Sequence, residues 1–528
     1  MSYNIIPKPA LSSIKNGMFE IRSDMYVYSF QETKYLSSSI SEWILQLFGY
    51  EVKMTDTQNG DSRINLLLNP ELYSVKEDGY VLEITKSAII VQSKTHIGLY
   101  YGIQSLKLIL LDAKNKGGQE ISCGIIQDSP RFSWRGFMLD TGRHFHPVST
   151  IKKLLDIMAL LKMNVFHWHL TEDQGWRIEI KKYPKLIKIG SKRKDSNTSS
   201  FFGKKYTGIP HEGYYTQEEI KDVVQYAADR FITVIPEIEL PGHSIAAIAS
   251  YPELGCTGKQ IEVATDRGVF SEIYCAGRES TFEFLQDVLD EVMELFPSDI
   301  IHIGGDEVPK KRWKECHYCQ ERIRQEGLRN EDELQVYFTN RIGKYLKSKG
   351  KRLMGWNEIL GDTLEPSAIC HWWIGKEEDK MVHLWRGRDM VFSNRFQTYL
   401  NLNYTIAPMR FFYNWDPVPS KLGIHLEQHI LGVEAPLWTE PIPTYEKLGK
   451  HVFPRLLAVA EIGWTKKDIK NYPDFERRIP LVLRYLDMLG MPYSSISEAN
   501  PDNWKRFLHT KDWLLHLGMH LYFLLKGY

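Results

Sequence analysis

This 528-residue chain lacks an excess of charge, a long apolar run and a secretory signal. Its 66 basic and 66 acidic side chains give a formal net charge of zero, which removes the electrostatic attraction on which nucleic-acid binding depends. No run of about 18 apolar residues is present, so we expect no membrane span. The first residues contain neither a basic n-region nor an apolar h-region. This predicts a cytoplasmic protein, although a secreted chain whose leader has been removed would look the same.

Cysteine is also scarce, with six residues at positions 123, 256, 275, 316, 319 and 370. They are too few and too scattered for a disulfide scaffold of this size. Only Cys316 and Cys319 have a metal-like spacing, CxxC, and they supply two ligands where a structural zinc ion takes four. No second CxxC is present. The sequence therefore favours a structural or incidental pair over a zinc site, and we predict no metal.

Residues 1–130 are expected to form a separate small α/β domain. At roughly 150 residues per domain, the chain is long enough for two to four domains. Short apolar runs predict strands at 64–68, 79–84 and 87–92, flanked by helices at 36–48 and 97–111. Polar residues do not converge in this region, so its expected role is packing or stabilisation.

From residue 131 to 495 the sequence repeats a strand, a loop and a helix. Strands are expected at 135–140, 164–170, 233–240, 300–305, 352–356, 368–373, 390–393 and 430–435. Helices are expected at 150–161, 216–230, 281–296, 333–347 and 445–462, the second opening with a Thr216–Glu219 capping box. Eight β/α units over about 360 residues predict a (β/α)8 TIM barrel with enlarged loops. The longest insertion, 171–215, would line one wall of a pocket. Residues 496–528 would form a helical tail that packs on its own barrel or on a neighbour.

In such a barrel, the chemistry lies at the carboxyl ends of the strands. The residues at these ends are Asp140 and Arg143; His169 and Asp173; Glu237, Glu239 and His243; Asp306 and Glu307; Trp356 and Glu358; Trp372 and Trp373; Tyr399 and Asn401; Trp438 and Glu440. All eight ends thus carry polar or aromatic groups that suit hydroxyls or the apolar faces of sugars. The 14 Trp and 28 Tyr of the chain fit sugar binding or a large core equally well.

The fourth strand end, Ile300-Ile-His-Ile-Gly-Gly-Asp-Glu307, carries the strongest signal. Gly304 and Gly305 remove side chains below the two acids, which lets a ligand ring approach the backbone. Helix capping explains one acid but neither glycine. A standard retaining glycosidase places its acid and nucleophile across the bond, about 5 Å apart and usually on different strands. Two adjacent acids indicate instead that one protonates the leaving oxygen and the other steers a nucleophile belonging to the substrate.

The segment His302-Ile-Gly-Gly-Asp-Glu307 resembles the His-x-Gly-Gly-Asp-Glu signature of family 20 glycoside hydrolases, the β-N-acetylhexosaminidases. Other segments resemble the family in the same order: Arg131-Phe-Ser-Trp-Arg-Gly-Phe-Met-Leu-Asp140, Phe166-His-Trp-His-Leu-Thr-Glu-Asp-Gln-Gly-Trp-Arg177, Pro236-Glu-Ile-Glu-Leu-Pro-Gly-His243, Gly355-Trp-Asn-Glu358 and Leu437-Trp-Thr-Glu440. The likeness covers nearly the whole chain, including the domain before the barrel. It implies exo-acting, retaining removal of terminal β-linked GlcNAc or GalNAc from oligosaccharides or glycoconjugates, through an oxazolinium intermediate and without a cofactor.

The resemblance also implies a role for each matching residue. Glu307 would be the general acid/base. Asp306 would hold the N–H of the 2-acetamido group and stabilise the developing positive charge, while Tyr399 would bind the acetamido oxygen. The other matches would bind the sugar or support Glu307: Trp356, Trp373 and Trp438 as walls, with Trp372 the alternative to Trp373; Arg143 and Glu440 on hydroxyls; Asp173 and His243 behind Glu307.

One position departs from the family pattern. Many members carry an aspartate two residues after the tyrosine, where this chain has Asn401. An amide keeps an acceptor and adds a donor but loses the charge. We therefore expect hydroxyl recognition to be tuned differently there, which leaves the preference between gluco- and galacto-configured sugars open.

Two alternatives remain from the residues alone. The first is a barrel glycosidase that forms a covalent intermediate on Glu237, Glu239 or Glu358. A substrate without the 2-acetamido group distinguishes it, because only the covalent mechanism hydrolyses a plain β-glucoside efficiently. The second is a sugar-binding protein without activity, which the intact Asp306–Glu307 pair disfavours and a chromogenic substrate tests.

Overall fold

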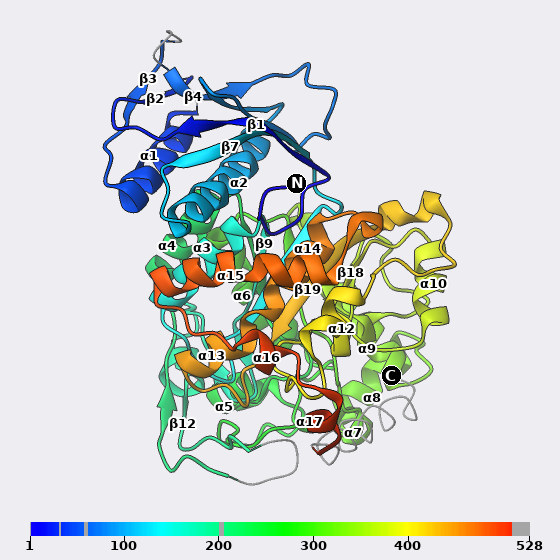
Figure 1. Ribbon diagram of the computed structural model, residues 1–528. Helices are drawn as coiled ribbons and strands as arrows, with labels where there is room; N and C mark the ends of the chain where they lie inside the picture. Colours follow the sequence, from blue (N-terminus) through cyan, green and yellow to red (C-terminus); the bar gives the residue numbers. More distant parts are fainter. Residues whose placement is uncertain (1, 31–32, 58–61, 200–204, 509–528) are drawn as a thin grey trace.

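The computed structural model describes residues 2–30, 33–57, 62–199 and 205–508, and Figure 1 shows a smaller domain beside a larger one. In the described part, the smaller domain holds a seven-stranded sheet in the order β1-β7-β5-β6-β4-β2-β3. Its strands are β1 Leu11–Glu20, β2 Tyr26–Ser29, β3 Lys53–Thr55, β4 Ser62–Leu68, β5 Tyr80–Ile84, β6 Ile89–Ser93 and β7 Glu120–Asp128. Burial alternates along β5 and β6, as in a sheet with one packed face. The three predicted strands are present as β4, β5 and β6.

Two helices cover this sheet, α1 (Lys34–Phe48) and α2 (His96–Asn115). Helix α2 is buried on nearly all sides, because it contacts strands of the sheet and also α3 (Val148–Leu160) and α15 (Tyr472–Leu489) of the larger domain. A helix that is apolar all round is expected in such a position between two layers. Figure 1 shows α2 between the sheet and the barrel. The domain therefore docks through α2.

A buried ion pair ties the first residues to the end of the barrel domain. Arg478 of α15 binds Glu461 of α14 (Arg455–Trp464) at 2.7 Å, and both side chains are at most 1% exposed. Arg478 also donates to the carbonyl of Ile5 at 2.7 Å, and the Lys8 N–H donates to Glu461 at 3.0 Å. The amino-terminal segment thus completes the hydrogen bonding of a charge pair that burial would otherwise leave partly unsatisfied.

Within the described residues, eight parallel strands close a barrel in the order β14-β15-β16-β17-β18-β19-β8-β9. They are β8 Trp134–Asp140, β9 Val165–His169, β14 Thr233–Glu237, β15 Ile300–His302, β16 Arg352–Trp356, β17 Ile369–Trp372, β18 Met390–Phe392 and β19 Ile430–Leu437. Each corresponds to a predicted strand, so the predicted (β/α)8 barrel preceded by an α/β domain is confirmed. These strands are buried on both faces, which explains their continuous apolar runs.

Helices surround the barrel, and several short ones lie within the loops between its strands. They are α3, α4 Gln217–Ala228, α5 Ile245–Ser250, α6 Glu279–Leu295, α7 Lys311–Glu315, α8 His317–Gln325, α9 Glu331–Ser348, α10 Glu377–Trp385, α11 Arg395–Thr398, α12 Met409–Asn414, α13 Tyr445–Val452, α14, α15, α16 Ile496–Ala499 and α17 Asn503–Leu508. The Thr216–Glu219 capping box is present at α4. The single helix predicted at 445–462 is wrong, because Pro454 lacks an N–H and separates α13 from α14.

The insertion at 171–215 contains short hairpin strands, β10 Thr171–Glu172 with β11 Gly175–Trp176, and β12 Lys192–Arg193 with β13 His211–Glu212. The expected carboxyl-terminal tail falls mostly at 509–528, outside the described residues. Among the helices that the structure does describe, none combines the length and apolarity that crossing a bilayer requires.

The barrel interior changes from apolar to ionisable toward the carboxyl ends of its strands. A small apolar cluster contains Val165, Ile235, Met354 and Val391 from four of the strands. Two residues further along β9 and β14, His167 and Glu237 lie 3.1 Å apart, and Glu434 of β19 binds His167 at 2.7 Å. All three are fully buried. This polar layer forms the floor beneath the strand ends.

Candidate active site

The two acids predicted at the fourth strand end lie in a tight, left-handed turn. Strand β15 ends at His302, earlier than expected, because Gly304 and Gly305 have φ values of 65° and 92°. Glu307 itself has φ 49°, a conformation that a non-glycine residue adopts only when its surroundings impose it. A Cβ at Gly304 would lie 1.8 Å from Glu239 Oε2. The glycines therefore let the chain turn over the Glu239 carboxyl and present both acids.

The carboxylates of Asp306 and Glu307 both lie close to the imidazole of His243. The imidazole Nε2 lies 3.8 Å from Asp306 Oδ2 and 3.7 Å from Glu307 Oε2, and the ligand atoms of all three residues fall within 4.8 Å of one another. The side chain of Asp306 is 12% exposed and that of Glu307 is 21% exposed. Glu307 is thus the more accessible of two closely spaced acids.

Burial and charge give Glu307 a pKa suited to proton transfer. Burial raises its pKa to about 7, with Asp306 adding to the rise and His243 opposing it. Burial also raises the pKa of Asp306, and His243 again opposes the shift. A carboxyl with a pKa near 7 exists in both protonation states at neutral pH, as a residue that alternates between acid and base requires.

His243 is fixed behind the acids by two other carboxylates. It follows β14 with φ 47°, and its Nδ1 lies 2.8 Å from Glu172 Oε1 and 3.1 Å from Asp173 Oδ2. Burial alone would lower the pKa of His243, but Glu172 and Asp173 outweigh it and hold the pKa well above its usual value. The imidazolium is therefore a fixed cation that faces both acids.

Arg143 lies on the opposite side of Glu172. Its Nη2 is 3.1 Å from Glu172 Oε2, its Nη1 is 3.6 Å from Asp140, and its guanidinium lies 4.8 Å from the centre of the Trp438 ring. The Nε and Nη1 atoms have no hydrogen-bond partner among the described residues. Arg143 therefore keeps donors for a ligand while two acids hold its position.

Other buried polar atoms of the predicted site also lack a partner within the described chain. They are Asp306 Oδ1, Asn401 Oδ1, Glu440 Oε2 and His243 Nε2. Buried polar atoms are normally hydrogen-bonded, and several exceptions at one end of a barrel mark a place where a polar ligand completes the bonding.

Aromatic rings stand beside these polar groups. Trp373 and Tyr399 stack with centroids 6.1 Å apart, and Trp438 lies 6.4 Å from Tyr399 and 5.7 Å from Trp356. Trp372, the alternative to Trp373, packs instead in a separate cluster with Phe132, Leu384 and Phe392. The geometry thus brings together Trp356, Trp373, Trp438 and Tyr399, and it places Trp372 elsewhere.

The three acids considered as covalent nucleophiles are all engaged or neutral. Glu237 accepts from Trp356 Nε1 at 2.8 Å and contacts His169 at 2.5 Å and His302 at 2.8 Å. Burial raises the pKa of Glu239 well above its usual value, and Asp306 adds to the rise. Glu358 accepts both its bonds from the Trp373 indole, at 3.0 and 3.1 Å, and burial raises its pKa well above its usual value. Glu237 is therefore engaged by its neighbours, and the raised pKa values of Glu239 and Glu358 disfavour the ionised form that a nucleophile needs.

Two residues of this site were missed in the sequence. Glu172 links His169, His243 and Arg143, and its pKa is lowered despite burial, because Arg143 and His243 stabilise its charge. Its position directly before Asp173 was the available signal. Arg395, at the start of α11, lies over the Trp373 ring at 5.9 Å and lowers the pKa of Glu307 electrostatically. Arg395 lies outside every motif recognised in the sequence, so no local signal pointed to it.

Known proteins are similar to this chain over nearly its whole length. A family model described as "Glycosyl hydrolase family 20, catalytic domain" matches residues 132–467, and one described as "Glycosyl hydrolase family 20, domain 2" matches residues 2–129. The β-hexosaminidase of Porphyromonas gingivalis is 40% identical over 529 residues, covering 96% of this chain and 66% of that protein. The chain thus spans about two thirds of that relative's length.

Solved structures agree with this match. The exo β-N-acetylglucosaminidase of Vibrio harveyi, solved with N-acetylglucosamine, has a TM-score of 0.82 and 31% identity over 93% of this chain and 78% of that chain. The β-N-acetylhexosaminidase of Bacteroides fragilis has a TM-score of 0.78 and 31% identity over 95% and 99%. The chain belongs to glycosyl hydrolase family 20. It is a glycoside hydrolase with the activity of a β-N-acetylhexosaminidase, which confirms the resemblance seen in the sequence.

Proposed function

We propose that this enzyme removes terminal β-linked GlcNAc or GalNAc from glycans by an exo-acting, retaining mechanism in which the substrate's own 2-acetamido group is the nucleophile. The observation that carries the proposal is the pair of adjacent acids beside one imidazolium, while Glu237 is engaged by other side chains and the pKa values of Glu239 and Glu358 are raised. A retaining mechanism needs a nucleophile, and the 2-acetamido oxygen supplies one.

In the first step, protonated Glu307 gives its proton to the leaving oxygen while the acetamido oxygen attacks C1. The C1–O bond breaks, and a C1–O bond to the acetamido group forms an oxazolinium ion. Asp306 accepts the acetamido N–H through Oδ1, which has no partner in the described chain, and its charge stabilises the cation. Tyr399 donates to the acetamido oxygen, and Trp356, Trp373 and Trp438 surround the methyl group and the ring.

In the second step, Glu307 accepts a proton from water, which attacks C1 and reopens the ring with retention. His243 acts as a positioning residue: its charge, fixed by Asp173, faces both acids and keeps the pKa of Glu307 from rising further. Arg143 and Glu440 hold sugar hydroxyls through their unpartnered atoms, as the N-acetylglucosamine-bound relative from Vibrio harveyi supports for a terminal sugar.

The decisive experiment compares a nitrophenyl N-acetyl-β-glucosaminide with the matching nitrophenyl β-glucoside. We expect the glucoside to be nearly inert, since it lacks the nucleophile, and a thiazoline mimic of the oxazoline to inhibit strongly. NMR of the first product should show the β-anomer. Efficient hydrolysis of the glucoside, or an α-configured first product, would contradict substrate assistance. Cleavage of defined oligosaccharides from the non-reducing end, one sugar at a time, tests exo action.

A further inference from the structure

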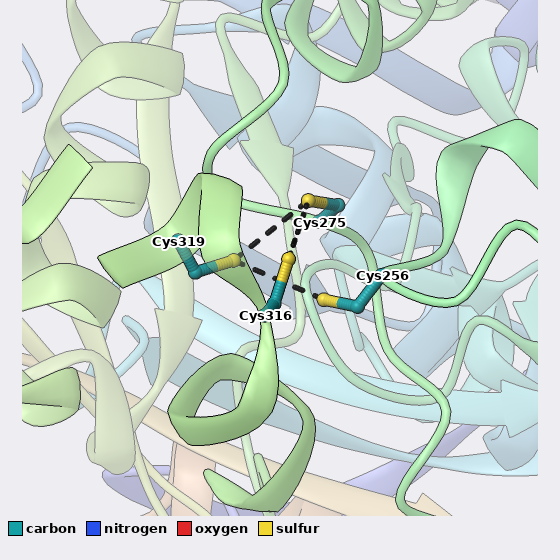
Figure 2. Close-up of side chains that lie close together, drawn as sticks. All are labelled: Cys256, Cys275, Cys316 and Cys319. Atoms are coloured by element: carbon teal, nitrogen blue, oxygen red, sulfur yellow. Dashed lines mark hydrogen bonds between the residues drawn. The ribbon is translucent and has the colours of Figure 1, made fainter. Parts of the chain in front are cut away.

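Four cysteines from the two barrel loops that follow β14 and β15 lie close together. Cys256 and Cys275 lie in the loop between α5 and α6, and Cys316 and Cys319 lie where α7 passes into α8 (Figure 2). We call these four residues the cysteine cluster. The prediction of an isolated CxxC pair is wrong, because the fold brings Cys256 and Cys275 to it from 41 to 63 positions away.

The spacing of the sulfur atoms is that of a tetrahedral metal site. Sγ–Sγ distances are 3.8 Å for Cys256–Cys319, 3.8 Å for Cys275–Cys316 and 3.7 Å for Cys275–Cys319, and all four atoms lie within 4.8 Å of one another. A disulfide requires about 2.05 Å. Four thiolates at about 2.3 Å from one zinc ion, at tetrahedral angles, are about 3.8 Å apart. The observed distances match the second geometry.

The cluster is also held in place before any ligand arrives. Cys275 and Cys319 are fully buried, Cys316 is 7% exposed and Cys256 is partly buried, so bulk water has little access to three of the four residues. The Cys275 N–H donates to the Leu254 carbonyl at 2.8 Å, and the Gln320 N–H donates to the Cys316 carbonyl at 3.0 Å. These backbone bonds fix the directions of the side chains, which Figure 2 shows converging on one point.

We propose that the cysteine cluster binds one zinc ion as a closed tetrathiolate site. A site with four protein ligands leaves no position for substrate or water, so its role is structural. Each thiol loses its proton to the solvent as the metal binds. A polynuclear iron–sulfur cluster would hold the four Sγ atoms farther apart than 4.8 Å. A single iron ion fits the same sulfur geometry and is an outcome of the test.

The ion would cross-link the two loops that carry the catalytic groups. The loop after β14 contains His243, and the loop after β15 contains Asp306 and Glu307. Contacts next to the cluster cross between them: Trp313 Nε1 donates to the Tyr274 carbonyl at 2.9 Å. The Tyr274 N–H in turn donates to the carbonyl of Pro241, two positions before His243, at 3.0 Å. The metal therefore supports the placement of His243 against the acids.

The test is the metal content of the purified full chain, prepared under reducing conditions and dialysed against metal-free buffer. Elemental analysis should find one zinc per chain, and zinc X-ray absorption should show a shell of four sulfur atoms at about 2.3 Å. A mercurial reagent added to the wild-type protein should release that zinc to a coloured chelator as the thiols react. Stoichiometric iron, a Cys256–Cys319 disulfide, or metal-free protein that does not take up added zinc would each overturn the assignment.

Variants locate the ion. Cys319→Ser should weaken zinc binding by more than about 100-fold and lower the thermal midpoint. Cys123→Ser, a buried cysteine of β7 outside the cluster, should retain one zinc. Equal zinc loss in both variants, or full retention in Cys319→Ser, would refute the site. If Cys319→Ser does not fold, zinc release from the wild-type chain still decides the question.

Discussion

The pKa of about 7 at Glu307 predicts a specific pH dependence of kcat/KM. Glycosidic cleavage needs the protonated form, so kcat/KM should be lost as pH rises through 7. With this pKa, about half of the enzyme is protonated at pH 7, about one tenth at pH 8 and about one hundredth at pH 9. The slope above pH 8 should therefore be tenfold per pH unit.

Two substitutions test the origin of this falling limb of the pH profile of kcat/KM. Glu307→Gln removes the proton donor, so kcat/KM should fall by about 10²–10⁴-fold and lose its dependence on pH above 7. His243→Asn keeps a residue that tolerates the positive φ of 47° but removes the cation that opposes the shift, so the limb should move to higher pH.

The assay is kcat/KM from pH 5 to 10, measured on a nitrophenyl N-acetyl-β-glucosaminide, with circular dichroism to confirm folding at each pH. A wild-type limb above pH 9, or the same limb in Glu307→Gln, would refute the assignment of the titrating acid to Glu307. A limb that stays in place in His243→Asn would refute the electrostatic role of the imidazolium.

Three further predictions concern recognition and stability. Asn401→Asp restores a charge at an atom without a partner in the described chain, so the ratio of kcat/KM for GlcNAc and GalNAc substrates should change. Gly304→Ala should lower the free energy of unfolding by about 2–4 kcal/mol in urea titrations, because of its positive φ and its approach to Glu239. Arg478→Ala leaves Glu461 charged and buried, so calorimetry should record a loss of about 3–5 kcal/mol.

The two stability predictions each have a matched control. Gly350 has φ 76° and open space around its Cβ position, so Gly350→Ala should lose only about 1 kcal/mol. Arg477 pairs with Asp474 at the surface, and Arg477→Ala should change stability by less than about 1 kcal/mol. Equal losses in test and control would contradict the arguments from contact and burial. An unchanged sugar preference in Asn401→Asp would show that position 401 does not determine the preference between GlcNAc and GalNAc.

The barrel could be predicted because its strands are buried on both faces and read as apolar runs. Strands such as β1 and β7 could not, since their sequences carry polar residues in irregular alternation and become strands by pairing with each other. The split of the helix at Pro454, in contrast, can be predicted, because proline lacks an N–H and interrupts a helix.

The catalytic acids were predictable because they are adjacent in the chain and follow two glycines. Glu172 and the cysteine cluster depend on how loops cross in space. A single sequence gives no direct measure of that distance: Cys256 and Cys319 are 63 positions apart, yet their sulfur atoms are 3.8 Å apart. The local sequence pattern therefore predicts the catalytic acids, whereas the residues around them depend on long-range packing that the pattern does not show.

The Arg478–Glu461 pair also sets an order of events during synthesis. Its partners at Ile5 and Lys8 leave the ribosome 473 and 453 positions earlier than Arg478 and Glu461. At about 5–20 residues per second, the amino-terminal segment waits roughly half a minute to a minute and a half for its binding site. The small domain can form its sheet during that interval, but residues 5–8 dock only after α15 has been made. Docking of the first segment is thus a late step in the assembly of this protein.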